Sequence, residues 1–251
     1  TIIDANTGTV ISYVNIGIPE KAIGTVSDLN GVYEFEVQDE NDEIVISCIG
    51  YKTIQITAKE FLVLEEVQLI PVEYAIDEVT VVASRFKNEV ILGVENPTKR
   101  GMSLGFGSNQ LGTEVACPIA VKQTTYIKSF NFVLNHAKGD SMIFRLNIYE
   151  LNKDGIGEQI LKEQIVIREK QKKGLHTIDL SAIDLVLDQN VLVSLEWLED
   201  DGGKGNQGLS FNMRKSKKPN GFYLKIASQA EMKHLKEVGK WTPAFYFEGF
   251  Y

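Results

Sequence analysis

Alternation of apolar and polar positions is the strongest pattern along this chain. The stretch at residues 24–37, "GTVSDLNGVYEFEV", ends in a run whose every second residue is aromatic or apolar: Tyr33, Phe35 and Val37. A period of two is typical of a strand with one buried face. Just before it, Asn30-Gly31 supplies the positive φ that tight turns need, and Asp28 can bond its own backbone two residues on. The stretch therefore predicts strand, tight turn, strand, and its two oxygen-bearing turn residues are too few for a calcium loop.

The neighbouring segments repeat this pattern. "IIDANTGTVISYVNIGI", at residues 2–18, predicts a strand, an Asn-Thr-Gly turn and further strand. "EIVISCIGYKTIQI", at residues 43–56, places Ile44, Ile46 and Cys48 on one face and breaks at Gly50-Tyr51. The first third of the chain is therefore predicted to be a β-sheet body.

Several spaced positions of this first third carry a family resemblance. They match, in order, the pattern of the carboxypeptidase regulatory-like domain: Asp4, Thr7-Gly8, Val14-Asn15, Gly24-Thr25, Asp28, Gly31, Tyr33, Phe35 and Ile49-Gly50-Tyr51. The resemblance covers about residues 1–82 and implies a transthyretin-like β-sandwich. "IDEVTVVAS", at residues 76–84, is similar to the run that follows this domain in many TonB-dependent outer-membrane transporters. Only 251 − 84 = 167 residues follow, too few for such a barrel, so we expect a last sandwich strand leading into a linker.

Residues 101–251 show alternation again. "IKSFNFVL" puts Phe130, Phe132 and Leu134 on one face, and "MIFRLNIYEL" does the same with Met142, Phe144, Leu146 and Ile148. Many short strands with regular turns favour a sandwich or jelly roll. "FRLNIYELNKDGIGEQIL", "GLHTIDLS" and "VLVSLEWLE" resemble the jelly-roll region found after regulatory-like domains in uncharacterised bacterial surface proteins, for which no activity is known. The one helical pattern is "AEMKHLKEV", residues 230–238.

The fold prediction is therefore all-β, with two β-sandwich domains, transthyretin-like and then jelly-roll-like. The predicted boundaries are 1–83 for the first domain, 84–100 for a linker and 101–251 for the second domain. Charge supports the division, because residues 1–90 hold 5 basic and 16 acidic residues (net −11), whereas residues 91–251 hold 21 and 18 (net +3), which together give −8. Trypsin is expected to cut first after Arg85, Lys87, Lys99 or Arg100.

Composition narrows the functional classes. No apolar run is long enough for a transmembrane helix, and an acidic protein repels the phosphates of nucleic acid. Of the two cysteines, Cys48 and Cys117, the first lies on an apolar strand face, which favours a buried free thiol over a disulfide. The resemblance implies the periplasm or outer-membrane surface of a Gram-negative bacterium, reached after removal of a leader absent from this sequence.

A few segments match catalytic or metal-binding motifs, but each has a simpler structural interpretation. "GMSLG", residues 101–105, matches the nucleophile-elbow spacing, but an elbow needs a buried strand before Ser103 and a helix after it, and the flanking sequence predicts neither. The three histidines, His136, His176 and His234, have no partner at metal-ligand spacing. The acidic loop at Glu199, Asp200 and Asp201 could hold Ca²⁺, although a solvated loop is the simpler interpretation. No cofactor is predicted.

Aromatic residues are the remaining candidates for ligand contact. Trp197 shares a face with Val191, Val193 and Leu195, so it is predicted to lie in the core. Trp241, Tyr246 and Phe250 could instead form a platform for sugar rings, or fill an interface. The sequence thus favours a non-catalytic cell-envelope or surface module that binds or positions a glycan or a partner protein. A structural accessory of an outer-membrane or transporter-associated complex is the alternative, and an enzyme is the third possibility.

Overall fold

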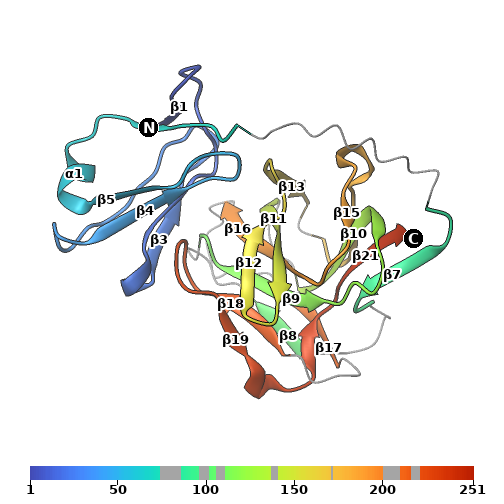
Figure 1. Cartoon of the computed structure of the whole chain (residues 1–251). Helices are drawn as coiled ribbons and strands as arrows, with labels where there is room; N and C mark the ends of the chain where they lie inside the picture. The colour runs from blue at the N-terminus through green and yellow to red at the C-terminus, as the bar shows by residue number, and fades with distance from the viewer. Residues whose placement is uncertain are drawn as a thin grey trace.

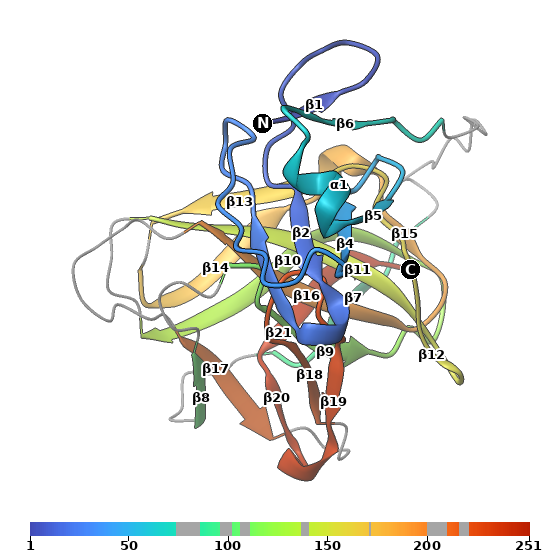
Figure 2. The same ribbon diagram turned by 90° about the vertical axis from the view of Figure 1, so that its left-hand side faces the viewer.

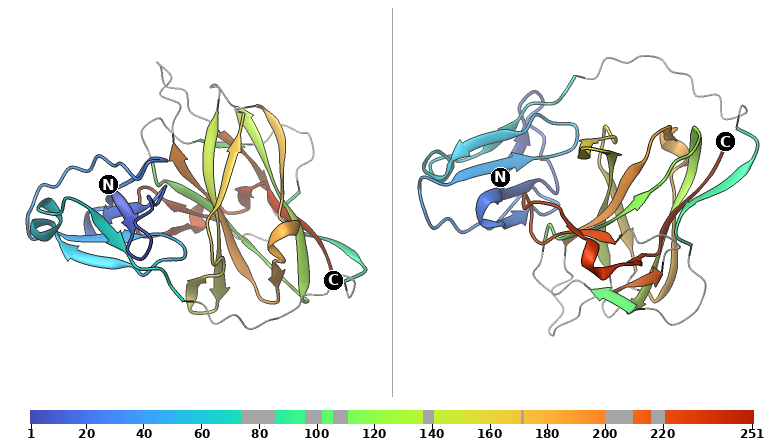
Figure 3. Two further views of the ribbon diagram at one scale, coloured as in Figure 1. Left: turned by 90° about the horizontal axis from the view of Figure 1, so that it is seen from above. Right: turned by 60° about the horizontal axis from the view of Figure 1, so that its bottom comes forward.

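The structure is a computed structural model. It describes residues 1–73, 86–95, 102–105, 111–136 (the backbone alone at 136), 141–170, 172–199, 210–215 and 221–251. Its described elements are almost entirely β-strands that pack as β-sandwich-like bodies, which confirms the all-β prediction. A smaller N-terminal body lies beside a larger C-terminal one, and the two chain termini lie on opposite sides of the molecule (Figures 1 and 3).

The N-terminal body holds a four-stranded sheet in the order β3-β2-β4-β5 and a parallel pair β1-β6. Its elements are β1 (Ile2–Asp4), β2 (Asn15–Ile18), η1 (Pro19–Lys21), β3 (Ile23–Val26), β4 (Glu43–Ser47), β5 (Ile54–Thr57), α1 (Ala58–Leu62) and β6 (Val67–Leu69). Alternate residues of β2 and β4, such as Ile16, Ile44 and Ile46, are fully buried and form one core with Phe61 of α1. Burying such a side chain contributes roughly 1.5–3 kcal/mol, so these strands are stabilised mainly from one face.

The turn at Asp28–Gly31 forms as predicted, but the strand after it does not. Asp28 Oδ1 accepts the backbone N–H groups of Asn30 and Val32, each at 2.8 Å, and Gly31 has a φ of +67°. Residues 32–37 keep the alternating burial, and Tyr33 and Phe35 pack against the core. They form no strand and pair with no strand among the described residues. Alternation therefore predicted correctly which side chains face inward, but it did not guarantee a ladder partner.

The C-terminal body is built from two large sheets. The seven-stranded sheet has the order β12-β11-β16-β9-β18-β19, with β13 added beside β11. Its strands are β9 (Glu114–Ile119), β11 (Met142–Asn152), β12 (Gly155–Gln159), β13 (Ile165–Glu169), β16 (Val191–Glu199), β18 (Phe222–Lys225) and β19 (Lys233–Leu235). Strands β11 and β16 lie at its centre and pair over eight register positions.

The eight-stranded sheet is organised around the long strand β10. Its strands are β7 (Glu89–Gly93), β8 (Met102–Gly105), β10 (Thr125–His136), β14 (Gly174–Asp179), β15 (Val186–Leu187), β17 (Ser210–Lys215), β20 (Trp241–Pro243) and β21 (Phe245–Phe250). Two short 3-10 turns, η3 (Ser181–Ile183) and η4 (Lys236–Val238), complete this body. Phe130, Phe132, Phe144 and Trp197 are buried between the two sheets, as the alternation predicts.

Two segments differ from their sequence-based interpretation. Residues 89–93 of the expected linker form β7, which pairs with β21, and Leu92 joins the core of the C-terminal body. Residues 230–238 were expected to be helical, but residues 233–235 form strand β19 and residues 236–238 a 3-10 turn. The helical interpretation is therefore wrong, because pairing with β18 supplies the hydrogen bonds that a helix would otherwise make. The "IDEVTVVAS" segment lies outside the described residues, and both the domain boundaries and the jelly-roll topology stay predictions.

Candidate functional site

The outer face of the seven-stranded sheet gathers polar residues from strands far apart in sequence. Even-numbered residues of β11, such as Phe144 and Leu146, point into the core, so Arg145, Asn147 and Tyr149 lie on the opposite face. The strand register then places four charged residues side by side across four strands: Arg145 on β11, Glu196 on β16, Glu114 on β9 and Lys225 on β18. We call these four residues the charged row.

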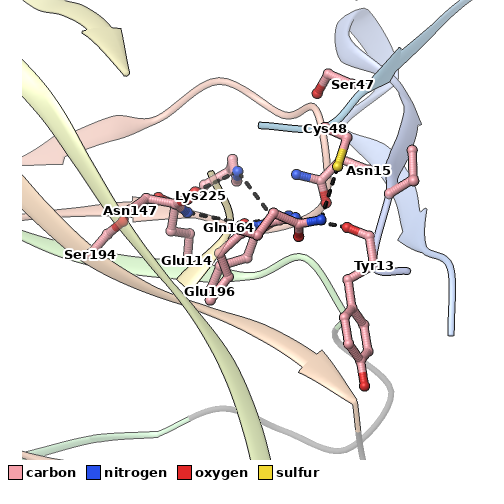
Figure 4. Close-up of polar contacts among 12 residues, drawn as sticks. Tyr13, Asn15, Ser47, Cys48, Glu114, Asn147, Gln164, Ser194, Glu196 and Lys225 are labelled. Atoms are coloured by element: carbon pink, nitrogen blue, oxygen red, sulfur yellow. Dashed lines mark hydrogen bonds and ion pairs between the residues drawn. The ribbon is translucent and has the colours of Figure 1, made fainter. Parts of the chain in front are cut away.

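The charged row is buried and internally paired. Arg145 Nε and Nη2 donate to Glu196 Oε2 at 2.9 and 2.8 Å, and Lys225 Nζ lies 2.5 Å from Glu114 Oε2 and 3.7 Å from Glu196 Oε1. Glu114 is fully buried, and Arg145 and Glu196 are each 1% exposed. Asn147 Nδ2, Tyr149 Oη and Ser194 Oγ all donate to Glu114 Oε1. Figure 4 shows Glu114, Glu196 and Lys225 of this cluster beside the ribbon of the N-terminal body.

The electrostatics of the row favour its ionised state. Burial alone would raise the pKa of Glu196, but the neighbouring charges of Arg145 and Lys225 outweigh it and hold that pKa at about 2. Burial would lower the pKa of Lys225, but Glu114 and Glu196 raise it. Burial, followed by the charge of Glu114, raises the pKa of Tyr149 well above its ordinary value. Both carboxylates are thus matched by cations inside the protein, as buried ion pairs require.

The N-terminal body covers this end of the sheet. Arg145 Nη1 donates to the backbone carbonyl of Tyr13 at 2.7 Å and to Gln164 Oε1 at 2.8 Å. Gln164 Nε2 in turn donates to the carbonyl of Ser12 at 3.1 Å and to Cys48 Sγ at 3.0 Å. Figure 2, which faces the N-terminal body, shows β2 and β4 standing in front of β11 and β16. The Arg145 end of the charged row is therefore covered by the N-terminal body.

A loop of the C-terminal body makes a second contact with the N-terminal one. Gln229 Nε2 donates to Ser47 Oγ at 2.7 Å and to the carbonyl of Asn15 at 3.3 Å. The neighbouring Ser228 is fully buried against two glycines of the N-terminal sheet. A Cβ added to Gly17 would lie 2.6 Å from the Ser228 carbonyl oxygen, and one added to Gly24 would lie closer still. Only glycines allow the loop to approach this closely.

The opposite end of the same face is open and forms a groove. Its inner part has a volume of about 430 Å³ and its outer part about 1050 Å³, and both are lined by Leu151, Tyr223, His234 and Lys236. The rings of Tyr223 and His234 stack with centroids 4.1 Å apart and planes 9° apart. Tyr223 lies on β18 two residues before Lys225, so the groove begins where the covered charged row ends. Volumes of this order are usual for ligand sites.

The three aromatic residues predicted to contact a ligand do not form one surface. Trp241 is half-buried on β20, where the Lys215 ammonium lies 5.3 Å from its ring centroid. Tyr246 is 6% exposed, so its ring presents no face to a ligand. Phe250, also half-buried, lies at the far end of β21 beside Glu89 and Tyr126. Ligand contact by Trp241 or Phe250 stays a prediction, but the groove lies elsewhere.

The other sequence candidates are separated in space. Ser103 lies within strand β8, paired with Asn212, in keeping with the rejection of an elbow. His176 stacks on Phe132, and its Nε2 lies 2.7 Å from the Lys172 carbonyl oxygen. Glu199 accepts a hydrogen bond from Tyr13 Oη at 3.0 Å. The rest of the acidic loop, Asp200 and Asp201, lies outside the described residues, as does the side chain of His136.

Several absences apply to the described part of the chain alone. There, no group of three His, Cys, Asp or Glu residues is arranged to hold a metal ion, and no helix is both long and apolar enough to cross a membrane.

Cys48 and Cys117 are both buried free thiols, as expected for Cys48, and burial raises their pKa values to about 11 and about 12. Trp197 is 1% exposed in the core, which confirms that prediction.

Sequence reasoning missed both ends of this face. In an alternating strand, polar positions such as Arg145 and Glu196 normally face solvent, and nothing in their own segments indicates a covering domain. Tyr223 and His234 are brought together by the β18–β19 pairing. The available signal was the concentration of unlike charges, Arg145, Glu196, Glu114 and Lys225, at outward positions of separate strands.

Comparison with known proteins identifies the first part of the chain. Residues 1–81 match the family model of the CarboxypepD_reg-like domain, which confirms the resemblance read from the motif positions. No curated protein matches the chain. A similar solved structure is "Structure of infectious bursal disease virus Gx strain", with 9% identity and a TM-score of 0.34, covering 100% of this chain and 58% of that chain. A likeness this weak carries no argument about fold or function.

Proposed function

Since residues 1–81 form a CarboxypepD_reg-like domain, we propose that this chain is a non-catalytic module of the cell envelope that binds a glycan in the groove of its C-terminal body. Its proposed location is the periplasm or outer-membrane surface of a Gram-negative bacterium. CarboxypepD_reg-like domains are themselves non-catalytic. The N-terminal domain would hold the C-terminal body in a fixed orientation.

The observation that carries this proposal is the contrast between the two ends of one sheet face. The buried carboxylates of this face, Glu114 and Glu196, are both paired with internal cations and donors, and no carboxylate lines the inner groove among the described residues. The groove itself offers a stacked aromatic pair, apolar side chains and exposed polar groups. That combination suits binding of a sugar by contact and hydrogen bonding.

The test is a glycan array probed with the intact chain, followed by titration calorimetry with any glycan retained. Tyr223→Ala should abolish binding, whereas Trp241→Ala and Phe250→Ala should leave the dissociation constant unchanged. Thermal melts of each variant check that the fold persists. Sensitivity to Trp241 or Phe250 alone would move the site to the other sheet, and steady release of reducing ends from a retained glycan would replace binding with hydrolysis.

One observation favours the structural-accessory alternative. Leu62, Val63 and Leu64, at the end of α1, are 59%, 78% and 44% exposed, and consecutive exposed apolar residues are typical of protein contacts. If the chain is an accessory, Val63→Asp should release it from isolated outer membranes while glycan binding is retained. Retention of the variant on those membranes would exclude this surface as the contact.

A further inference from the structure

The inner part of the groove is lined mainly by hydrogen-bond donors among its polar groups. Besides apolar residues it presents Asn190, Tyr223, His234 and Lys236, and no carboxylate lines it among the described residues. Asn190 Oδ1 already accepts the backbone N–H of Val121 at 3.0 Å. Its Nδ2 group, like the Lys236 ammonium, has no partner among the residues that the structure describes. A ligand here must therefore supply acceptors.

The positive charge of Lys236 also favours a ligand that supplies hydrogen-bond acceptors. A carboxylate next to an ammonium forms a charge-assisted hydrogen bond, which is about twice as strong as a neutral one. The protein as a whole carries −8, so it repels anions at long range. An anion is therefore attracted only at short range, through contact with Lys236 and Asn190. At physiological salt, electrostatic attraction is screened beyond about 8 Å.

The apolar side of the inner groove suits a ring. Pro118 and Leu151 lie beside the stacked pair of Tyr223 and His234. Stacking on His234 holds the Tyr223 ring in one orientation, and burial raises the pKa of its hydroxyl, which therefore stays protonated and can donate. An apolar surface beside convergent donors matches a sugar ring, which presents C–H groups on one face and oxygens around its edge.

The outer groove differs in charge from the inner one. Lys153 and Lys233 are exposed there together with Asp154 and Glu231. Apart from Lys236, which lines both parts of the groove, the two ammonium groups and the two carboxylates of this part balance. It has a volume of about 1050 Å³, which gives room for further sugar residues. Selection by charge is therefore expected only at the inner end.

From these observations we propose that the inner groove binds an acidic sugar residue, a hexuronate or a ring of similar charge, within a longer glycan. The carboxylate would meet Lys236 and Asn190, and the ring would lie against Leu151 and the Tyr223–His234 stack. This inference rests on the proposed function, since it names the ligand class of the same groove.

The experiment compares a galacturonic acid trimer with its methyl ester, which has the same rings without the charges. Calorimetry on the intact chain should give binding about tenfold or more tighter for the acid, and added salt should reduce that difference. Lys236→Glu should weaken acid binding about tenfold and leave ester binding unchanged. Lys173→Glu, an exposed charge just before β14 of the other sheet, is the matched control and should change neither.

Asn190→Asp is a second variant that keeps the oxygen accepting the Val121 N–H while it replaces the Nδ2 donor by charge. It should also weaken acid binding selectively, and it serves if Lys236→Glu fails to fold. Equal affinity for acid and ester, with both lost in Tyr223→Ala, would overturn the acidic class but leave a glycan groove. No binding of any glycan on the array would overturn the proposed function as well.

Discussion

The two ends of the outer face of the seven-stranded sheet have similar residue types and opposite roles. At one end Arg145 and Lys225 are buried and paired with Glu196 and Glu114, and Arg145 also donates to the Tyr13 carbonyl of the N-terminal domain. At the other end Lys236 is exposed and lines a groove. The strand pattern is the same in both places, so the difference comes from what covers the face. A buried charge must be matched inside the protein, whereas an exposed charge remains available for a ligand.

Removing one partner of the charged row should give the largest effect. Arg145→Met leaves Glu196 buried without its main cation and removes the donor to the Tyr13 carbonyl. We expect a loss of about 3–5 kcal/mol in the free energy of unfolding, measured by urea denaturation. The double variant Arg145→Met/Glu196→Leu should recover most of this loss, because no unpaired charge remains. A double variant as unstable as the single one would contradict a pairing role.

Acid should cause the second-largest loss of folding stability, because it protonates Glu196 in the charged row. The folded pKa of Glu196 is about 2, below its ordinary value of 4.5, so its stabilising contribution is present above 4.5 and is lost as pH falls towards 2. The loss is on the order of 3 kcal/mol, at 1.36 kcal/mol per pKa unit. Melting temperatures across this range should fall less steeply for Glu196→Gln than for the unmodified chain. Glu237→Gln, an exposed control, should follow the unmodified chain.

Strand β7 offers a way to sharpen the comparison between the two domains. A fragment of residues 86–251 retains β7 and the burial of Leu92, whereas residues 101–251 lack both. We expect the shorter fragment to be less stable by about 2–4 kcal/mol, from loss of apolar burial and edge pairing. Thermal melts of both fragments provide the measurement. Equal stability of the two fragments would mean that β7 does not belong to the C-terminal body. In that case limited trypsin digestion of the whole chain should cut as readily after Lys99 as after Arg85.

Gly31→Val tests the N-terminal domain without touching the charged row. Gly31 has a φ of +67°, and an added Cβ would lie 2.9 Å from the Ile2 carbonyl oxygen. A β-branched residue resists this conformation, so we expect a loss of roughly 1–3 kcal/mol. Differential scanning calorimetry should show it, and Gly8→Val, with a similar φ but open space around it, separates backbone strain from the steric clash. An unchanged melting temperature would rule out this turn geometry.

The smallest effect on stability is expected at the groove. Lys236→Glu changes an exposed charge that makes no ion pair among the described residues, so the free energy of unfolding should change by less than about 0.5 kcal/mol. Urea denaturation beside Arg145→Met is the measurement. A loss comparable to that of Arg145→Met would show that Lys236 is structural and that the two ends of the face do not differ as described.

Alternation along the chain by itself determined which side chains face inward. Phe130, Phe132 and Phe144 could be placed in the core, and the motif positions between Asp4 and Tyr51 identified the regulatory-like domain. Period-two patterns are local, and burial of one face is the main reason they exist. The same local pattern predicts a helix at residues 230–238, but residues 233–235 instead pair with strand β18, at residues 222–224.

Only the tertiary structure decided what happens on the polar faces of the strands. Arg145, Glu196, Glu114 and Lys225 are separated by up to 111 residues between Glu114 and Lys225, and strand register alone brings them into one row. Whether such a row faces water depends on a separate domain docked through Tyr13, Ser47 and the glycines at 17 and 24. Burial of a polar face is a property of two surfaces together, so no single segment of sequence encodes it.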